Sequence, residues 1–207
     1  VGILGDVELS WGKAPILEQP SVFAMLSPDL SSAEMTIGAT LVSTSDTPVD
    51  GVLTARLRET GQEASASLKV EKGSSRHKLS IKISNPDLWW PVGHGKQALY
   101  HLELAWTSCG ETQSELLRTG VRKVEMDQAP HPVKGRYCAL RVNNRLIFAK
   151  GGNWVPADML YSEVTGERYR ELVRLALDAN FNILRIWGGG IFADKSLMDA
   201  CDESGIM

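Results

Sequence analysis

Two side chains in the last part of the sequence could form a polar ligand site. Residues 181–187 read FNILRIW, and alternate residues of a strand face opposite sides, so Arg185 and Trp187 are expected opposite Leu184 and Ile186. An inward-facing arginine is costly unless it is paired or meets a polar ligand. An indole offers a flat apolar surface for a sugar ring. The structural alternative is that Arg185 pairs with a neighbouring strand and Trp187 fills the core.

A second polar segment, GGNWVPAD at residues 151–158, follows another apolar run. It supplies an amide, an indole and a carboxylate from Asn153, Trp154 and Asp158. Polar groups on loops of a rigid scaffold are candidate ligand contacts. Asp158 alone does not make an acid–base pair, and a cap for the following segment is the simpler interpretation. The glycines at 188–190 lack the spacing of a phosphate-binding loop and predict a tight turn.

Adjacent tryptophans form a third cluster in the segment LWWPVGHG, residues 88–95. Neighbouring residues of a strand point to opposite faces, so we expect one of Trp89 and Trp90 inside a β-sandwich and the other at a domain contact. A platform for carbohydrate is the alternative.

No metal or cofactor is indicated. The four histidines lack the spacing of metal ligands on a helix: His77, His94, His101 and His131. The three cysteines are widely spaced and form neither a disulfide framework nor a metal clip: Cys109, Cys138 and Cys201. We interpret the cysteines as small buried hydrophobic residues.

The scaffold that must position these residues changes character along the chain. Between residues 14 and 125, short alternating runs separated by turn residues recur about seven times, which predicts an immunoglobulin-like β-sandwich. From 126 to 207, expected strands at 146–150 and 181–187 alternate with amphipathic helices at 165–180 and 194–204.

Strands that alternate with helices indicate a parallel sheet, and in a β/α barrel the active site forms where strands end. Two β/α units cannot close a barrel of eight. The predicted fold class is therefore mainly β: an immunoglobulin-like β-sandwich followed by the first two β/α units of a truncated (β/α)8 TIM barrel.

Composition narrows the class of protein. The 207 residues are 43% hydrophobic and 23% charged, with a net charge of −3, which argues against a disordered or collagen-like chain. Neither a nucleic-acid nor a membrane partner is expected, because the chain is acidic and no apolar run approaches about 18 residues. With neither an initiator methionine nor a signal peptide, the sequence reads as part of a larger protein, and it gives no indication of compartment.

Several motifs, in order, resemble glycoside hydrolase family 2. Residues 2–9 resemble the end of its sugar-binding jelly-roll domain, and residues 85–100 the signature of its immunoglobulin-like domain. The first barrel strand and its loop resemble residues 148–158, and the second resembles residues 182–190. The segment that leads into the third strand resembles residues 201–206. The resemblance implies a jelly-roll tail at 1–13, the sandwich at 14–125 and an incomplete catalytic barrel at 126–207.

Trp187 followed by three glycines resembles the β-mannosidase branch of that family, whereas other branches carry a Ser-His-Tyr-Pro-like sequence there. The resemblance implies a retaining exo-β-glycosidase that acts on terminal β-mannosides of oligosaccharides. It implies that Trp187 lines the −1 sugar subsite and that Arg185 lies beside the nucleophile. Asn153, Trp154 and Asp158 would lie near the pocket mouth.

The resemblance also implies two catalytic glutamates, one of which follows an asparagine, and the sequence contains no Asn-Glu dipeptide. We expect both to lie beyond this polypeptide, which should be inactive by itself. Its partners would be the missing jelly-roll and barrel segments, or a second copy through unpaired strand edges. Two alternatives stay open: a non-catalytic module that binds carbohydrate or protein, and a family member for another sugar such as β-glucosamine.

Overall fold

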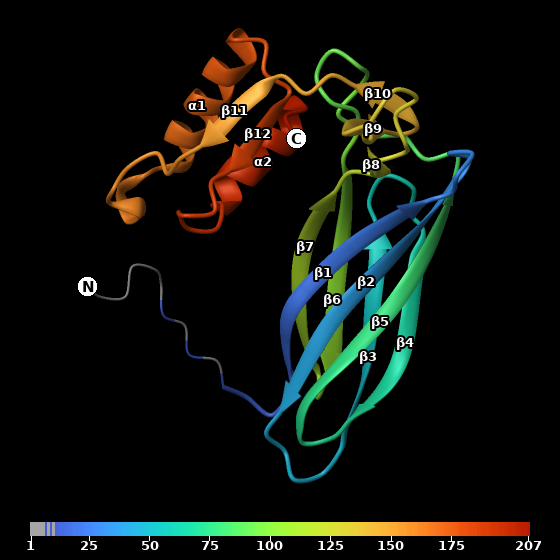
Figure 1. The fold of residues 1–207 in the computed structure, drawn as a ribbon. Helices are drawn as coiled ribbons and strands as arrows, with labels where there is room; N and C mark the ends of the chain where they lie inside the picture. The colour runs from blue at the N-terminus through green and yellow to red at the C-terminus, as the bar shows by residue number, and fades with distance from the viewer. Residues whose placement is uncertain (1–6, 8, 10) are drawn as a thin grey trace. The chain divides into compact units, whose positions relative to one another are not determined.

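The computed structural model describes residues 7, 9 and 11–207 (Figure 1), so most of the expected jelly-roll tail lies outside the described residues. The chain divides into two compact units. One extends to Asp87 and resumes with Leu99–Val121; the other contains Leu88–Ala98 and Arg122–Met207. Within the described residues, no helix has the length and apolar character needed to cross a membrane.

Seven antiparallel strands in two sheets build the first unit (Figure 1). One sheet has the order β1-β2-β5, with β1 at Ile16–Leu26, β2 at Ser32–Ser43 and β5 at Gly73–Ser84. The other has the order β4-β3-β6-β7, with β3 at Val49–Leu57, β4 at Glu63–Val70, β6 at Tyr100–Ser108 and β7 at Glu111–Thr119. This β-rich arrangement is consistent with the predicted sandwich.

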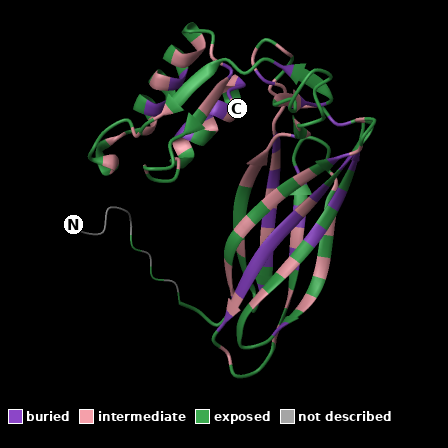
Figure 2. Ribbon diagram, in the orientation of Figure 1, coloured by how far each residue is buried: buried purple, intermediate pink, exposed green. Residues whose placement is uncertain are grey.

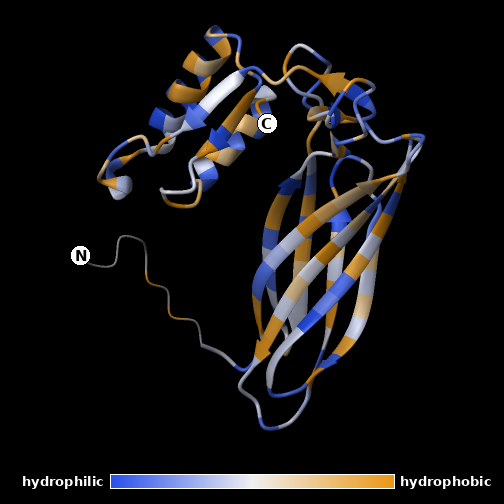
Figure 3. Cartoon of the chain, in the orientation of Figure 1, coloured by the Kyte–Doolittle hydropathy of each residue, from blue (hydrophilic) through white to orange (hydrophobic). Residues whose placement is uncertain are grey.

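The core of this unit follows from alternation along its central strands. Every second residue of β6 is buried, and buried and more exposed residues alternate along the strands of this unit (Figure 2). Leu102, Leu104 and Trp106 are fully buried. β2 buries Met35 and Ile37 in the same way, and Figure 3 shows polar and apolar residues alternating along the strands. Burial of each large apolar side chain contributes roughly 1.5–3 kcal/mol, so this pattern fixes which face of each strand is internal.

Trp106 fits only because a glycine lies beside it. A Cβ added at Gly51 would lie 2.5 Å from Trp106 Cη2 and 2.7 Å from Thr107 O. Gly51 is on β3, hydrogen-bonded to β6, so it leaves the space that the indole fills.

The turn between β1 and β2 is organised by one carboxylate. Asp29 accepts hydrogen bonds from Ser27 Oγ at 2.7 Å, Ser31 Oγ at 2.8 Å and Ser31 N at 3.2 Å. These bonds, with the Ser27 hydroxyl first, lower the pKa of Asp29 from 3.8 to about 2.

The second unit contains two small sheets. Three antiparallel strands have the order β10-β9-β8, with β8 at Val124–Asp127, β9 at Ala139–Val142 and β10 at Arg145–Ile147. Asn143 and Asn144 join β9 to β10 with φ of +47° and +65°, as a two-residue hairpin turn requires. The second sheet pairs β11, Gly151–Trp154, in parallel with β12, Ile183–Ile186.

Two helices follow these parallel strands, and both lie within the ranges 165–180 and 194–204 expected from the sequence. After a short 3-10 helix at Tyr161–Glu163, α1 spans Gly166–Asp178 and α2 spans Lys195–Ser204. Thr165 caps α1 by accepting from Arg168 N, and Asp194 caps α2 by accepting from Ser196 N. Tyr169 and Val173 of α1 pack with Leu197, Ala200, Cys201 and Ile206 in the core of this unit.

Two expectations were wrong. No single strand covers residues 146–150. β10 ends at Ile147 in an antiparallel hairpin, and the parallel strand β11 starts only at Gly151. The backbones of β11 and β12 approach each other closely at Gly151, where a Cβ would collide with Ile183 O. This glycine therefore belongs to the paired strand and does not mark its end. The cysteines are not all buried either, since Cys109 and Cys138 are exposed.

Candidate functional site

The candidate site begins with a polar pair on the two parallel strands. Asn153 of β11 lies in register with Arg185 of β12, and paired residues of neighbouring strands share a face. Arg185 Nη1 donates a hydrogen bond to Asn153 Oδ1 at 3.2 Å, and both side chains are exposed. The strands therefore present a cationic group, oriented by an amide, near their carboxyl ends.

Trp154 lies on the opposite face of β11. It packs against the core between the helices, with its ring 6.3 Å from that of Tyr169 on α1. Leu184 packs against the same core. The structure thus separates Trp154 from Asn153, although the sequence analysis placed both near one pocket mouth.

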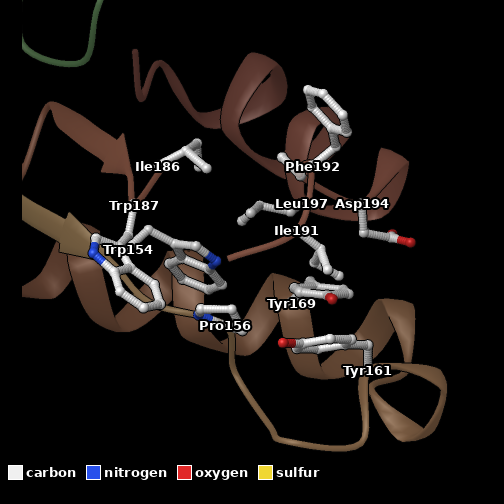
Figure 4. A pocket seen from close by; sticks show the side chains of 11 residues that line it. Trp154, Pro156, Tyr161, Tyr169, Ile186, Trp187, Ile191, Phe192, Asp194 and Leu197 are labelled. Carbon is white, nitrogen blue, oxygen red and sulfur yellow. The ribbon is translucent and has the colours of Figure 1, made fainter. Parts of the chain in front are cut away.

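A pocket opens where β11 and β12 end (Figure 4). The pocket is small: its cavity volume is about 20 Å³, and the figure reaches about 330 Å³ only when the adjoining space open to solvent is included. Its lining residues are Trp154, Pro156, Tyr161, Tyr169, Ile186, Trp187, Ile191, Phe192, Ala193, Asp194 and Leu197. The lining, all within the described residues, includes two of the five expected site residues, Trp154 and Trp187, but neither Asn153 nor Arg185.

Trp187 enters this pocket because the strand ends before it. β12 stops at Ile186, and Trp187 N donates to Trp154 O at 2.9 Å. Gly190 N then donates to Trp187 O at 3.2 Å, which closes the predicted tight turn. A Cβ at Gly189 would collide with the Trp187 indole, so the glycine lets the ring lie against the turn. The indole remains 45% exposed, which leaves part of its surface free.

The pocket is mainly aromatic and aliphatic, with Asp194 as the one carboxylate in its lining. That carboxylate is engaged as the cap of α2. Burial, and then the nearby Asp194 charge, raise the pKa of Tyr169, so its phenol stays neutral at ordinary pH. Neither Tyr169 nor Tyr161 is among the site residues expected from the sequence. The helical periodicity of residues 165–180 predicts a packed face, but it does not show that a phenol reaches the pocket.

Asp158 lies in an exposed segment before the short 3-10 helix. Its Oδ1 accepts a hydrogen bond from Leu160 N at 2.9 Å, which shapes the local turn as an Asx-type contact. Across the residues that the structure describes, no three metal-ligating side chains are clustered.

The chain resembles known proteins in both sequence and structure. The family model for glycosyl hydrolases family 2 matches residues 17–122. β-Mannosidase B of Neosartorya fischeri is 33% identical over 210 residues, covering 100% of this chain and 24% of that protein. β-Mannosidase of Rattus norvegicus is 30% identical over 211 residues, again covering 100% of this chain and 24% of that protein. The chain thus spans about a quarter of the length of these two relatives.

Among solved structures, the β-D-mannosidase of Dictyoglomus thermophilum superposes with a TM-score of 0.83 at 33% identity, covering 94% of this chain and 24% of that chain. The exo-chitosanase CsxA of Amycolatopsis orientalis superposes with a TM-score of 0.80 at 21% identity, covering 94% and 22%. The second likeness concerns the fold alone.

Proposed function

The chain belongs to glycosyl hydrolases family 2, and on that premise we propose that it is part of a retaining exo-β-glycosidase that hydrolyses terminal β-mannosides. The observation that carries this proposal is the extent of the similarity to β-mannosidases. The family model ends at residue 122, but the 33% identity to the Dictyoglomus thermophilum enzyme covers 94% of the chain. The similarity therefore includes the unit that carries Arg185 and Trp187.

The arrangement of that unit supports a barrel origin. β11, α1, β12 and α2 follow one another as two β/α units, and the strands are parallel. Met207 pairs with the backbone of β12, as the first residue of a third strand would. We therefore assign residues 126–207 to the start of a (β/α)8 barrel, after a sandwich at 14–125 and the tail of a preceding jelly-roll domain at 1–13.

In this proposal the two β/α units hold the sugar and tune the charge around it. The exposed part of the Trp187 indole stacks on the mannosyl ring in the −1 subsite. The Arg185 guanidinium, oriented by Asn153, stabilises the carboxylate nucleophile beside it. Trp154 supports the pocket from the helix side, and Asp158 shapes the loop at its mouth.

The reaction itself needs two carboxyl groups about 5–5.5 Å apart, one as acid/base and one as nucleophile. We propose that both are glutamates outside the 207 residues. Arg185 is not a substitute, because a guanidinium stays protonated and can neither attack the anomeric carbon nor exchange its proton. The partners of the chain are then a β-mannoside-containing oligosaccharide and the remaining segments of its own polypeptide, and no cofactor takes part.

Expression of the complete reading frame tests the proposal. We expect hydrolysis of 4-nitrophenyl β-mannoside with retention, seen as β-mannose forming first by proton NMR. The β-glucosaminide should react at least about tenfold more slowly. The purified 207-residue chain should show no turnover. Inversion, absence of β-mannoside hydrolysis by the complete protein, or turnover by the isolated chain that survives a contamination control would each contradict the proposal.

A further inference from the structure

The backbone of β12 is hydrogen-bonded on both of its edges. β11 occupies one edge, in register from Gly151 opposite Ile183. On the other, Met207 N donates to Asn182 O at 2.9 Å, and Leu184 N donates to Met207 O at 2.8 Å. Leu184 directly precedes the proposed site residue Arg185. The position of the Met207 backbone therefore influences the orientation of Arg185 on β12.

Met207 is held through the end of α2. Gly205 ends that helix with φ of +82°, and its carbonyl accepts a hydrogen bond from Val92 N at 2.9 Å. One turn earlier, Asp202 O accepts from Trp89 Nε1 at 2.7 Å, and Trp89 is fully buried. We call these four residues, Trp89, Val92, Asp202 and Gly205, the Trp89 latch. A Cβ at Gly205 would lie 2.5 Å from Val92 N, so only glycine permits this approach.

The Trp89 latch is itself fixed from two further directions. The Arg122 guanidinium lies 4.3 Å from the centre of a Trp89 ring and 3.5 Å from the Asp202 carboxylate. Asn143 Nδ2 donates to Trp89 O at 3.0 Å, while Asn143 Oδ1 accepts from Lys123 N at 2.9 Å. Asn143 is only 3% exposed, so its contacts are shielded from water. Movement of Trp89 would break its contacts with α2, with Arg122 and with Asn143.

We infer that Trp89 is a positioning residue for the site on β12, acting through α2 and Met207. Its indole N–H anchors the last turn of α2, which sets the position of Met207, which in turn fixes the edge of β12 beside Arg185. The inference deepens the proposed function and rests on it for the effect on catalysis. Its structural part, the link from Trp89 to the Leu184 and Met207 amides, stands independently.

Amide hydrogen exchange in the 207-residue chain tests that link. Trp89→Phe keeps an aromatic ring beside Arg122 but removes the N–H donor. We expect the Leu184 and Met207 amides to exchange about three- to tenfold faster, as loss of one hydrogen bond allows. Asp202→Ala is the matched control: it removes the Arg122 partner but keeps the carbonyl, so these two amides should stay within about twofold of the wild type.

Asn143→Gly is a second variant for the same link. Glycine readily adopts the φ of +47° at this position, and the substitution removes the hydrogen bond that Asn143 Nδ2 donates to Trp89 O. Exchange at Leu184 and Met207 should again accelerate, while the sandwich amides of Ile37 and Leu104 stay unchanged. Wild-type exchange at Leu184 and Met207 in both Trp89→Phe and Asn143→Gly would overturn the inference.

The catalytic part is tested by introducing Trp89→Phe into the complete reading frame. A positioning role predicts a kcat about three- to tenfold lower per folded molecule, with KM within about twofold. Faster exchange with an unchanged kcat would overturn the positioning role while the proposed function stands. If the unmodified complete protein hydrolyses no β-mannoside, the proposed function and the catalytic part fail together, and the exchange result still decides the latch.

Discussion

Asn153 of β11 accepts a hydrogen bond from the Arg185 guanidinium of β12, so one strand of the parallel pair orients the charged group of the other. In the complete enzyme, we expect Arg185→Ala to lower kcat/KM at least about 100-fold. Asn153→Ala should lower it about 10- to 100-fold, because a hydrogen bond to a charged group contributes about 1.5–3 kcal/mol. Arg174→Ala, which removes a helix-surface arginine paired with Asp178, is the control. Equal kinetics for Arg185→Ala and this control would contradict the assignment.

The Trp187 indole should contribute to sugar binding more than to stability. It is 45% exposed at the pocket, so Trp187→Ala exposes little core. We expect kcat/KM for an aryl β-mannoside to fall about 10- to 100-fold, with a change in melting temperature of only a few degrees. Trp11→Ala, which truncates a tryptophan that is 84% exposed, should change neither. Wild-type kinetics for Trp187→Ala would remove Trp187 from the proposed subsite.

Asn182 should be a major determinant of stability in the second unit. It is 1% exposed; its Nδ2 donates to Phe148 O and its Oδ1 accepts from Lys150 N. Asn182→Ala leaves both backbone groups without these partners, so we expect a loss of about 2–4 kcal/mol in the free energy of unfolding. Urea denaturation measures this loss. Asn180→Gly should cost little, because residue 180 has a φ of +61° that glycine readily adopts; similar losses in both variants would argue against the buried network.

Gly51→Ala tests packing in the sandwich. The new methyl group would lie 2.5 Å from Trp106 Cη2, so either the indole or the strand must move. Overpacking of this kind costs typically 1–3 kcal/mol, and thermal denaturation should show the corresponding fall in Tm. At Gly12 the same substitution meets nothing closer than Ala14 N at 4.0 Å and should be nearly neutral. Equal Tm values for the two variants would contradict the close contact.

The Asp29 turn should make stability depend on pH in the acid range. Because folding lowers the pKa of Asp29 from 3.8 to about 2, the folded state favours the ionised carboxylate. Its stabilisation is full above about pH 4 and is lost as pH falls toward 2. Asp29→Asn should therefore flatten that part of the curve when the free energy of unfolding is measured between pH 2 and 5. Identical pH profiles for both proteins would contradict the lowered pKa.

Local signals in the sequence predicted the helices well. Thr165 before α1 acts through its immediate neighbours, so its role can be inferred without knowledge of the fold. Gly151 could not be interpreted that way. Its reason for being glycine is the carbonyl of Ile183, 32 residues away in the sequence, and a pair of glycines looks locally like a turn.

The sequence predicted the orientation of the site residues only within β12, where side chains alternate between the two faces. Alternation correctly placed Leu184 toward the helix core and left Arg185 exposed on the other face. Trp187 lies beyond the last strand residue, where alternation no longer applies, and the turn rather than the pleat places it in the pocket. The destination of Trp89 depended on a contact with residue 202, for which the sequence carries no local signal.

The Trp89 latch also has a consequence for how the protein is made. Trp89 and the carbonyl that it binds are 113 residues apart in the chain. At synthesis rates of about 5–20 residues per second, Trp89 leaves the ribosome roughly 6–23 s before that carbonyl. During this interval β5 and β6 can pair with their own partner strands, but the Trp89 indole N–H has no acceptor until α2 emerges.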